Sequence, residues 1–397
     1  MWEKVKLGVI CDILGGYAFQ SEQYTNNEIP LVRISNITES SIVIDYQYTI
    51  TESPKYSAYE IKKGDILVAL SGATTGKFGM FTDSQKAYLN QRVGLIRAKA
   101  NICQAYIFNY LNLIKDDILR KAGGAAQPNI STKELANFEI PVPPQPIQEK
   151  IAAILDKADE FRRKDQELQR KYDELAQAIF IDMFGDPVKN EKGWEVRKLG
   201  EICRKITDGT HHSPKNTNEG YKYVTAKHIK NCKLDFNSNP TYVSETDHKE
   251  IFERCNPEFQ DVLYIKDGAT TGMAAVNTLT EEFSMLSSLA LFKLNKSFIN
   301  HDYLTYYLNA DFVKENLIRE FMAGAAIKRF TLQKIKNFNI LLPPLHLQQA
   351  FAKKIELINE LKEKANSTKS EELFQSLLQR AFKGDLVNAT ELGQTSD

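Results

Sequence analysis

The chain has 397 residues, of which 42% are hydrophobic and 26% charged, and this is enough apolar material for two or three globular domains. Its 51 lysines and arginines balance 51 aspartates and glutamates, so the formal net charge is zero. This balance excludes a basic nucleic-acid-binding tail and an acidic disordered chain, but it is compatible with a locally basic face.

The sequence contains two copies of one unit. The tryptophan-led start at 2–11 recurs at 194–203, the Gly-Ala-Thr-Thr-Gly loop at 72–76 recurs at 268–272, and Gly-Ala-Ala at 124–126 recurs at 324–326. The matches keep their order while the distance between them grows in small steps, as expected of a duplication with loop insertions. Both tryptophans of the chain, Trp2 and Trp194, hold matching positions.

The first part of each copy mixes strand and helix patterns. Short apolar runs at 66–70, 93–96, 262–265 and 289–292 predict strands. The segments 105–119 and 303–320 predict helices. We therefore predict two α+β globular domains, residues 1–145 and 186–344, each ended by a Pro-Pro pair (143–144 and 343–344) that cannot continue a ladder.

The second part of each copy predicts one long helix, residues 146–185 and 345–384, with a tail at 385–397. Apolar residues recur at steps of four and three among many charged ones, which is typical of a coiled-coil seam. The two helices are expected to pair antiparallel with each other; the alternative is two amphipathic helices that pack on their own domains. The predicted pairing residues are Ile147, Ile151, Ile154, Phe161, Leu168, Leu175, Leu347, Phe351, Ile358, Leu361 and Leu377.

The motifs that suggest catalysis or metal binding fail on inspection. The segment that begins at Ser71 does not match the P-loop pattern, because Ser71 stands where glycine is needed and Phe78 where Ser or Thr is needed. Asn-Pro-Glu-Phe at 256–259 lacks the second proline of the amino-methyltransferase tetrapeptide. The adjacent His211 and His212 cannot easily share a tetrahedral ion. We predict no catalytic residue and no metal site.

Divergent polar loops on a repeated frame are the candidates for DNA contact. The slot after Gly-Ala-Ala holds Gln and Asn in the first copy but Lys and Arg in the second. Gln and Asn pair with adenine, whereas Arg and Lys pair with guanine or phosphate. Neutral drift on exposed loops, and a plain tight turn for the Gly-flanked loops, are the open alternatives. The candidates are Arg33, Ser35, Asn36, Ser71, Thr74, Thr75, Lys77, Gln127, Asn129, Thr210, His211, His212, Lys227, His228, Thr270, Thr271, Lys328 and Arg329.

The whole chain resembles the specificity subunit of a Type I restriction–modification system. The resemblance is carried by the doubled starts at Trp2 and Trp194, the Gly-Ala-Thr-Thr-Gly loops, and the segments from Pro143 to Gln148 and from Pro343 to Gln348, each of which leads into a long charged helix. The end of the first long helix, Phe180 to Asp186, is similar to the family as well.

The resemblance implies two target-recognition domains in a pseudo-two-fold repeat, separated by two long helices that form an antiparallel coiled coil and act as a spacer. Each domain would read one half of a bipartite double-stranded DNA site. Two modification (adenine-N6 methyltransferase) subunits would dock on the helices and, with two restriction subunits, the assembly would cleave DNA. S-adenosylmethionine, ATP and Mg²⁺ would belong to those partners, and this chain would be a non-catalytic subunit.

Three other functions remain as alternatives. The first is a stand-alone nuclease or methylase, which the lack of a catalytic motif disfavours. The second is a coiled-coil scaffold that does not bind DNA. The third is the same architecture serving a different DNA-modification system.

The expected location is the cytoplasm. Five scattered cysteines without a Cys-x-x-Cys pair favour a reducing compartment. The N-terminal segment lacks the apolar region of a signal peptide, and no apolar run approaches the roughly 18 residues of a membrane span.

Overall fold

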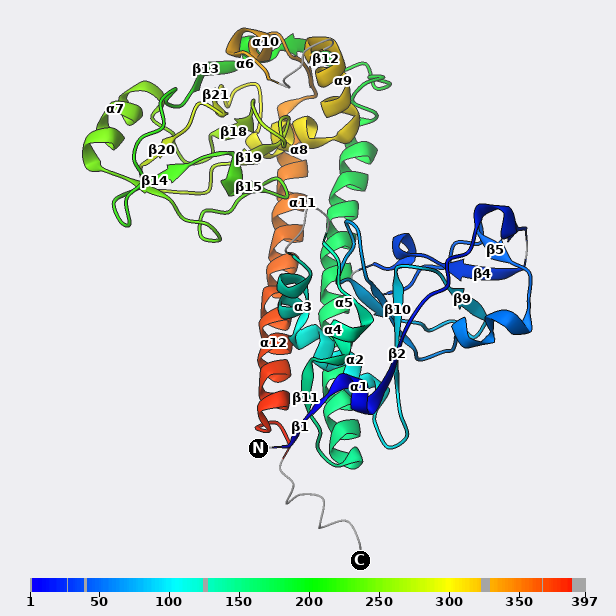
Figure 1. Ribbon diagram of the computed structural model, residues 1–397. Coiled ribbons are helices and arrows are strands. Elements are labelled where there is room, and N and C mark those ends of the chain that lie inside the picture. The colour runs from blue at the N-terminus through cyan, green and yellow to red at the C-terminus, as the bar shows by residue number, and fades with distance from the viewer. Residues whose placement is uncertain are drawn as a thin grey trace, which may run out of the picture. The chain divides into compact units, whose positions relative to one another are not determined.

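The protein is described by a computed structural model that covers residues 2–26, 28–38, 41–123, 128–322, 329–365 and 367–387 (Figure 1). The chain divides into two compact units, which we call unit 1 (residues 1–166 and 366–397) and unit 2 (residues 167–365). Each unit holds the first part of one copy of the sequence repeat, with strands and helices in both, together with sections of the long helices. The predicted α+β class is therefore confirmed.

Unit 1 is built on a four-stranded antiparallel sheet in the order β2-β10-β7-β8. A five-stranded sheet (β3-β5-β4-β9-β6) and the pair β1-β11 complete it. The strands are β1 (Lys4–Lys6), β2 (Cys11–Gly15), β3 (Tyr24–Thr25), β4 (Ile29–Val32), β5 (Thr49–Ile50), β6 (Glu60–Ile61), β7 (Ile66–Ala69), β8 (Phe78–Met80), β9 (Ala87–Leu89), β10 (Val93–Ala98) and β11 (Glu139–Pro141). The α-helices of this domain are α1 (Leu7–Ile10), α2 (Gln104–Leu113), α3 (Lys115–Ala122) and α4 (Thr132–Ala136).

Unit 2 repeats this plan with the four-stranded sheet β13-β21-β18-β19, the three-stranded sheet β17-β14-β20, and the pairs β15-β16 and β12-β22. The strands are β12 (Glu195–Lys198), β13 (Cys203–Asp208), β14 (Tyr221–Val224), β15 (Ile229–Lys230), β16 (Lys233–Leu234), β17 (Tyr242–Val243), β18 (Val262–Ile265), β19 (Ala274–Val276), β20 (Phe283–Met285), β21 (Leu289–Leu294) and β22 (Asn339–Leu342). The α-helices of this domain are α6 (Leu199–Ile202), α7 (Glu245–Cys255), α8 (His301–Asn309), α9 (Asp311–Met322) and α10 (Leu332–Lys336).

The central strands read as continuous apolar runs because both of their faces are covered. In β18, Val262 and Tyr264 belong to the core shared with the helices, whereas Leu263 and Ile265 face a second core against the smaller sheet. Alternate residues of β7 divide in the same way between two cores. The four-stranded sheet is thus the middle layer of each domain. Because both of its faces are packed, the ends of its strands are held in fixed positions.

The repeated Pro-Pro-x-x-x-Gln motif locks the start of each long helix. Gln148 is buried; its Nε2 donates to the Pro143 carbonyl (2.8 Å), and its Oε1 accepts from the Cys103 N–H at the start of α2 (2.9 Å). Gln348 makes the equivalent bonds to the Pro343 carbonyl (2.8 Å) and from the Asn300 N–H at the start of α8 (2.8 Å). In each copy, one buried amide therefore bonds a carbonyl just before the long helix and an N–H at the start of a second helix. Without the glutamine, these two backbone groups would lack this buried partner.

The long helix α5 (Gln145–Phe184) pairs with α12 (Ser367–Lys383) in unit 1 and with α11 (Leu345–Lys364) in unit 2 (Figure 1). In unit 1, Arg162 and Glu371 form an ion pair of 3.0 Å. In unit 2, Gln169 donates to the Lys362 carbonyl (2.8 Å), while the ring of Phe180 lies 5.6 Å from that of Phe351. Since positions rise along α5 as they fall along α11, the predicted antiparallel pairing is confirmed.

The C-terminal heptad pattern forms two helices, where the sequence predicted one helix over 345–384. Helix α11 ends at Lys364 and α12 begins at Ser367, next to the polar stretch 367–370. Gln169 of α5 donates to both the Lys362 and Ala365 carbonyls (2.8 Å each). These bonds satisfy two of the carbonyls that the end of α11 leaves free, so the break has partners on the facing helix.

The seam of α5 differs by one residue from the prediction at alternate positions. Ile147 and Ile151 are buried and Ile154 is partly buried, but beyond them the inward positions are Leu155, Arg162, Gln169 and Ala176. Phe161, Leu168 and Leu175 instead lie on the outer side, 56%, 37% and 46% exposed. The predicted stripe and the observed seam both alternate steps of three and four residues, so they have the same period. The period of the apolar pattern therefore does not show which of the two stripes faces the partner helix.

The remaining predicted pairing residues lie on α11 and α12. Phe351 and Ile358 are buried in the core of unit 2, and Leu347 is partly buried against it. Leu377 is partly buried against the core of unit 1. Leu361 is 43% exposed, because the seam passes through its neighbour Lys362. Leu361 is therefore a second correction of the same kind.

Candidate nucleic-acid interface

The candidate loops gather at one end of each four-stranded sheet, which we call the loop end. In unit 1, β2 and β7 finish there, at Gly15 and Ala69, and their antiparallel partner β10 begins there at Val93. In unit 2, β13 and β18 finish at Asp208 and Ile265, and β21 begins at Leu289. Antiparallel pairing therefore brings segments that are distant in sequence to the same edge.

In unit 1, the Gly-Ala-Thr-Thr-Gly loop is joined to the segment that carries Asn129. Ser71 and Asn129 form an antiparallel β-bridge, and the Thr75 hydroxyl donates to the Pro128 carbonyl (2.9 Å). The Thr74 hydroxyl reaches the Ile34 carbonyl at 3.5 Å, which places residues 33–36 beside the same loop. Three predicted segments thus share one surface, on which the Asn129 side chain is exposed.

Other candidates of unit 1 lie at this end in different environments. Ser35 is exposed, Lys77 is half-buried, and the Arg33 guanidinium lies 4.2 Å from the centre of the Tyr48 ring. Asn36 is buried, and its Oδ1 accepts from the Arg33 N–H (2.7 Å). The hydroxyls of Ser71 and Thr75 are also enclosed. Gln127 lies outside the described residues.

The second copy of the Gly-Ala-Thr-Thr-Gly loop, in unit 2, makes the same bridge with charged residues. Asp267 and Arg329 form the equivalent antiparallel bridge, and their side chains form an ion pair of 3.4 Å. Thr270 is exposed, whereas the Thr271 hydroxyl donates to the Gly268 carbonyl (2.7 Å) and closes the loop. Lys328 lies outside the described residues. The two copies therefore present different side chains on one backbone arrangement.

The segment after β13 brings two histidines to the loop end. Thr210 is buried, and its hydroxyl bonds within the turn to His212. His211 is exposed, with its Nε2 3.4 Å from Asp208, and the His212 Nε2 lies 3.8 Å from Glu250. In the described part of the chain no group of three His, Cys, Asp or Glu side chains is placed to hold a metal ion.

Two candidates beyond β14 have opposite environments. Lys227 is exposed and its Nζ donates to the Asn239 side chain (3.1 Å). His228 is fully buried: its Nδ1 accepts from the Thr225 N–H (2.9 Å), and its Nε2 lies 2.9 Å from the Asn239 carbonyl. Burial lowers the pKa of the His228 imidazole. The structure therefore differs from the prediction of exposed polar loops at four candidates. The side chains of His228, Asn36, Thr75 and Thr210 are buried and make hydrogen bonds that close turns inside the domains.

The buried imidazole makes the stability of unit 2 depend on pH. The unfolded chain takes up a proton near the ordinary histidine pKa of about 6.5, but the folded site resists it. The stabilisation is complete above that pH and falls as the pH drops below it, by at most about 1.4 kcal/mol per pH unit for one proton. The measurement is the free energy of unfolding in urea at pH 7.5 and at pH 5. We expect His228→Gln to remove the part of the loss between these two pH values that the His228 imidazole causes.

The exposed His346 of α11 supplies the matched control. His346→Gln should keep the pH dependence of the wild-type chain. An unchanged slope in His228→Gln would show that the folded site accepts the proton and would contradict this account.

Sequence reasoning missed three residues at the loop end of unit 2: Asp208, Arg254 and Lys266. Asp208 and Lys266 are both buried and form an ion pair of 3.3 Å, and the Arg254 Nη2 donates to Asp208 (2.9 Å). The signal was in the repeat, because Gly15 and Leu70 stand at the matching positions of the first copy.

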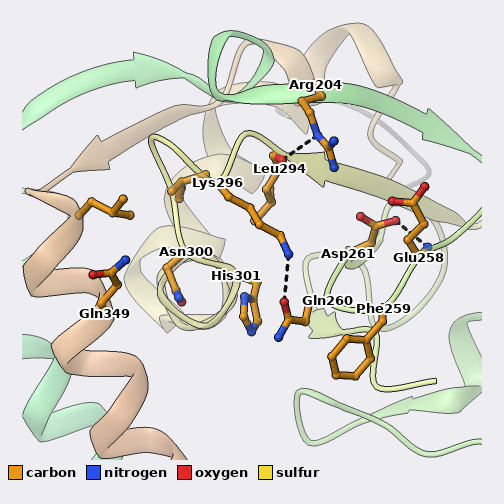
Figure 2. Close-up of a pocket in the computed structure, with 12 residues that line it drawn as sticks. Arg204, Glu258, Phe259, Gln260, Asp261, Leu294, Lys296, Asn300, His301 and Gln349 are labelled. Carbon is orange, nitrogen blue, oxygen red and sulfur yellow. Dashed lines mark hydrogen bonds between the residues drawn. The ribbon is translucent and has the colours of Figure 1, made fainter. Parts of the chain in front are cut away.

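A pocket of about 210 Å³ lies at the other end of the unit 2 sheet, around Arg204, Phe259, Lys296 and His301 (Figure 2). Its acidic groups Glu258 and Asp261 are both paired with Lys293 (3.0 Å each), and the Lys296 Nζ donates to Gln260 (3.1 Å). Elsewhere, burial raises the pKa of Cys11 and Cys203 to about 12, which keeps both thiols protonated. The two thiols are therefore not activated nucleophiles. The acidic and basic groups of the pocket named above are paired with one another or with neighbours, so the pocket provides no activated nucleophile either.

Comparison with known proteins identifies the family. A family profile described as "Type I restriction modification DNA specificity domain" matches residues 1–170 and 191–374. The chain belongs to this family. The resemblance stated from the sequence is thereby confirmed, including its place among specificity subunits and not among catalytic ones.

Members of the family align over nearly the full chain. The Type I restriction enzyme MjaIX specificity subunit of Methanocaldococcus jannaschii is 24% identical over 88% of this chain and 85% of its own. The EcoBI specificity subunit of Escherichia coli is 20% identical over 97% and 86%. The crystal structure of the M. genitalium S subunit has a TM-score of 0.60 at 17% identity, covering 96% of both chains, and shows the same fold. None of the helices in the described ranges meets the length and apolarity that a bilayer crossing requires.

Proposed function

We propose that this chain recognises a bipartite DNA site, with each loop end reading one half, and directs adenine-N6 methylation and restriction by partner subunits. One observation carries the proposal: the same joined loop occurs twice, with Ser71 and Asn129 in one copy and Asp267 and Arg329 in the other. A fixed backbone with different donors and acceptors is suited to two different target sequences.

The proposed contact surface keeps the exposed and half-buried candidates of each loop end, except Ser71, whose hydroxyl is enclosed, and Thr271, whose hydroxyl closes its own loop. Asparagine has the paired donor and acceptor that adenine requires, and arginine has the donors that guanine or phosphate accepts. In unit 1 the surface comprises Arg33, Ser35, Thr74, Lys77 and Asn129, and in unit 2 His211, His212, Lys227, Thr270 and Arg329.

The partners are proposed to bind the paired helices. Two modification subunits would dock there, two restriction subunits would join them, and S-adenosylmethionine, ATP and Mg²⁺ would be bound by those partners. The outer side of α5 supports this, because Phe161, Leu168 and Leu175 are large apolar residues left exposed. The domain limits 1–145 and 186–344, the spacer helices 146–185 and 345–384, the tail 385–397 and a cytoplasmic location belong to the same proposal; residues 388–397 lie outside the described ranges.

The test is co-expression with a cognate modification subunit in a host free of DNA methylation, followed by genome-wide mapping of N6-methyladenine. We expect a two-part motif with a fixed unread gap. Scattered or absent methylation, with the partner shown to be folded and bound, would contradict the proposal and favour the scaffold function.

A further inference from the structure

The loop end of unit 2 contains a buried ion pair between Asp208 and Lys266. Both side chains are 3% exposed, and the Lys266 Nζ lies 3.3 Å from Asp208 Oδ2. Asp208 is the last residue of β13, and Lys266 directly follows the last residue of β18. Burying a charge pair costs desolvation and contributes little to stability by itself, so its presence at a recognition surface suggests a positioning role.

The first copy has no charge at the matching positions. Gly15 pairs with Gly94 in the register that Asp208 and Ala290 share in the second copy, and Leu70 follows β7 as Lys266 follows β18. A glycine and a leucine therefore fill this place in unit 1. The fold does not require the ion pair, which points to a task specific to unit 2.

Arg254 is the third member of this group. Its Nη2 donates to Asp208 Oδ1 (2.9 Å), and its Nε lies 3.4 Å from the Asp208 backbone carbonyl. Because Lys266 already neutralises the Asp208 carboxylate, the charge of Arg254 is in excess at the surface, where its side chain is half exposed. His211 lies 3.4 Å from the other carboxylate oxygen and lines the same surface.

The orientation of Arg254 determines which donors it can offer. Asp208 engages Nε and one hydrogen of Nη2, so Nη1 and the second hydrogen of Nη2 are left to point away from the carboxylate. Two parallel N–H donors on a planar, fixed group match the O6 and N7 acceptors of guanine in the major groove. A guanidinium that is held in one orientation loses less entropy on binding than a free side chain.

We propose that Arg254 reads a guanine in the half-site recognised by unit 2, with Asp208 and Lys266 as positioning residues. This inference rests on the proposed DNA-recognition function. Removal of Arg254 leaves Asp208 paired with Lys266, so no buried charge is left uncompensated and the domain should fold.

The experiment maps N6-methyladenine for the wild-type chain, Arg254→Gln and Arg254→Lys, each co-expressed with the modification subunit in the methylation-free host. We expect both variants to relax one guanine position in one half of the motif, with discrimination reduced about 5- to 150-fold, the range expected for loss of a bidentate pair. The other half-site stays unchanged and serves as the internal control for folding and assembly.

Arg204→Gln is the matched control, because Arg204 is an exposed arginine near the opposite end of the same strand, β13. It should leave both halves of the motif unchanged. Asp208→Asn should weaken the same guanine position as the Arg254 variants, as expected of a positioning residue.

Two outcomes would overturn the inference: an unchanged motif in Arg254→Gln, or a uniform fall in methylation at all sites with the motif kept. The second would indicate a phosphate contact, which carries no sequence information. The absence of any two-part motif in the wild-type chain would instead reject the proposed function, so the two failures are distinguishable.

Discussion

Replacing Phe351 by alanine is expected to lower the free energy of unfolding of unit 2 by about 3–5 kcal/mol, the usual cost of removing a buried aromatic ring. Phe351 is fully buried, and its ring centre lies 5.6 Å from that of Phe180, 5.5 Å from Phe184 and 5.3 Å from Tyr306. This cluster joins α11 to α5 and to α8. Urea unfolding of the full chain, followed through the transition of unit 2, measures the loss.

Phe161→Ala is the control for the seam, followed through the unfolding transition of unit 1, to which Phe161 belongs. The same change is made on α5, but at a ring that is 56% exposed, so the free energy of unfolding should stay within about 0.5 kcal/mol of the wild type. Equal losses in the two variants would mean that Phe161 is part of the pairing seam after all. A negligible loss at Phe351 would show that the aromatic cluster does not stabilise the helix pairing.

The double substitution Leu168→Gln and Leu175→Gln is expected to weaken binding of the modification subunit by at least about 30-fold, corresponding to ~2 kcal/mol for the loss of apolar anchors at an interface. Both leucines lie in unit 2, seven residues apart, and both are exposed on the outer side of α5. Because both side chains are exposed, the double substitution should change the free energy of unfolding only slightly. Isothermal titration of the purified chain with the modification subunit measures the affinity.

Phe312→Gln is the control for this prediction. Phe312 is 62% exposed, but it lies at the start of α9 on the domain and not on the paired helices. Its substitution should leave the affinity unchanged. If the leucine variant binds as tightly as the wild type, the exposed stripe has another purpose and the partner docks elsewhere.

The duplicated fold was predictable because the repeated motifs have structural tasks in both copies. Gln148 and Gln348 show this most clearly: a glutamine four residues after a Pro-Pro pair bonds back to the first proline and across to a second helix. Such residues must be kept for the fold to form, so they mark the repeat in the sequence. The antiparallel helix pair was predictable for a similar reason, since sustained heptads need a partner.

The register of the seam could not be predicted in the same way. Ile154 and Leu155 are both apolar neighbours, and a heptad can be continued through either of them. The true seam passes through the polar Arg162 and Gln169, which bond across to α12 and α11. The apolar stripe one residue away is exposed. Apolar periodicity reveals that a helix has such a stripe, but not which partner covers it.

The candidate site was predicted in outline. The sequence indicated the segments around Ser71 and Asn129, and the structure joins them by a β-bridge. The errors are polar residues that serve the backbone of their own turns, as Asn36 and His228 do. Arg254 was missed because it lies on α7, far from Asp208 in the sequence, and its contact with Asp208 exists only in the folded chain.

Whether each loop end reads one half of the site is tested by comparing the methylation motifs of Asn129→Ala and Arg329→Ala. Both side chains are exposed and lie at matching bridge positions of the two copies. We expect each variant to relax a different half of the motif and to leave the other half intact. Relaxation of the same half by both variants, or an unchanged motif in both, would contradict this expectation.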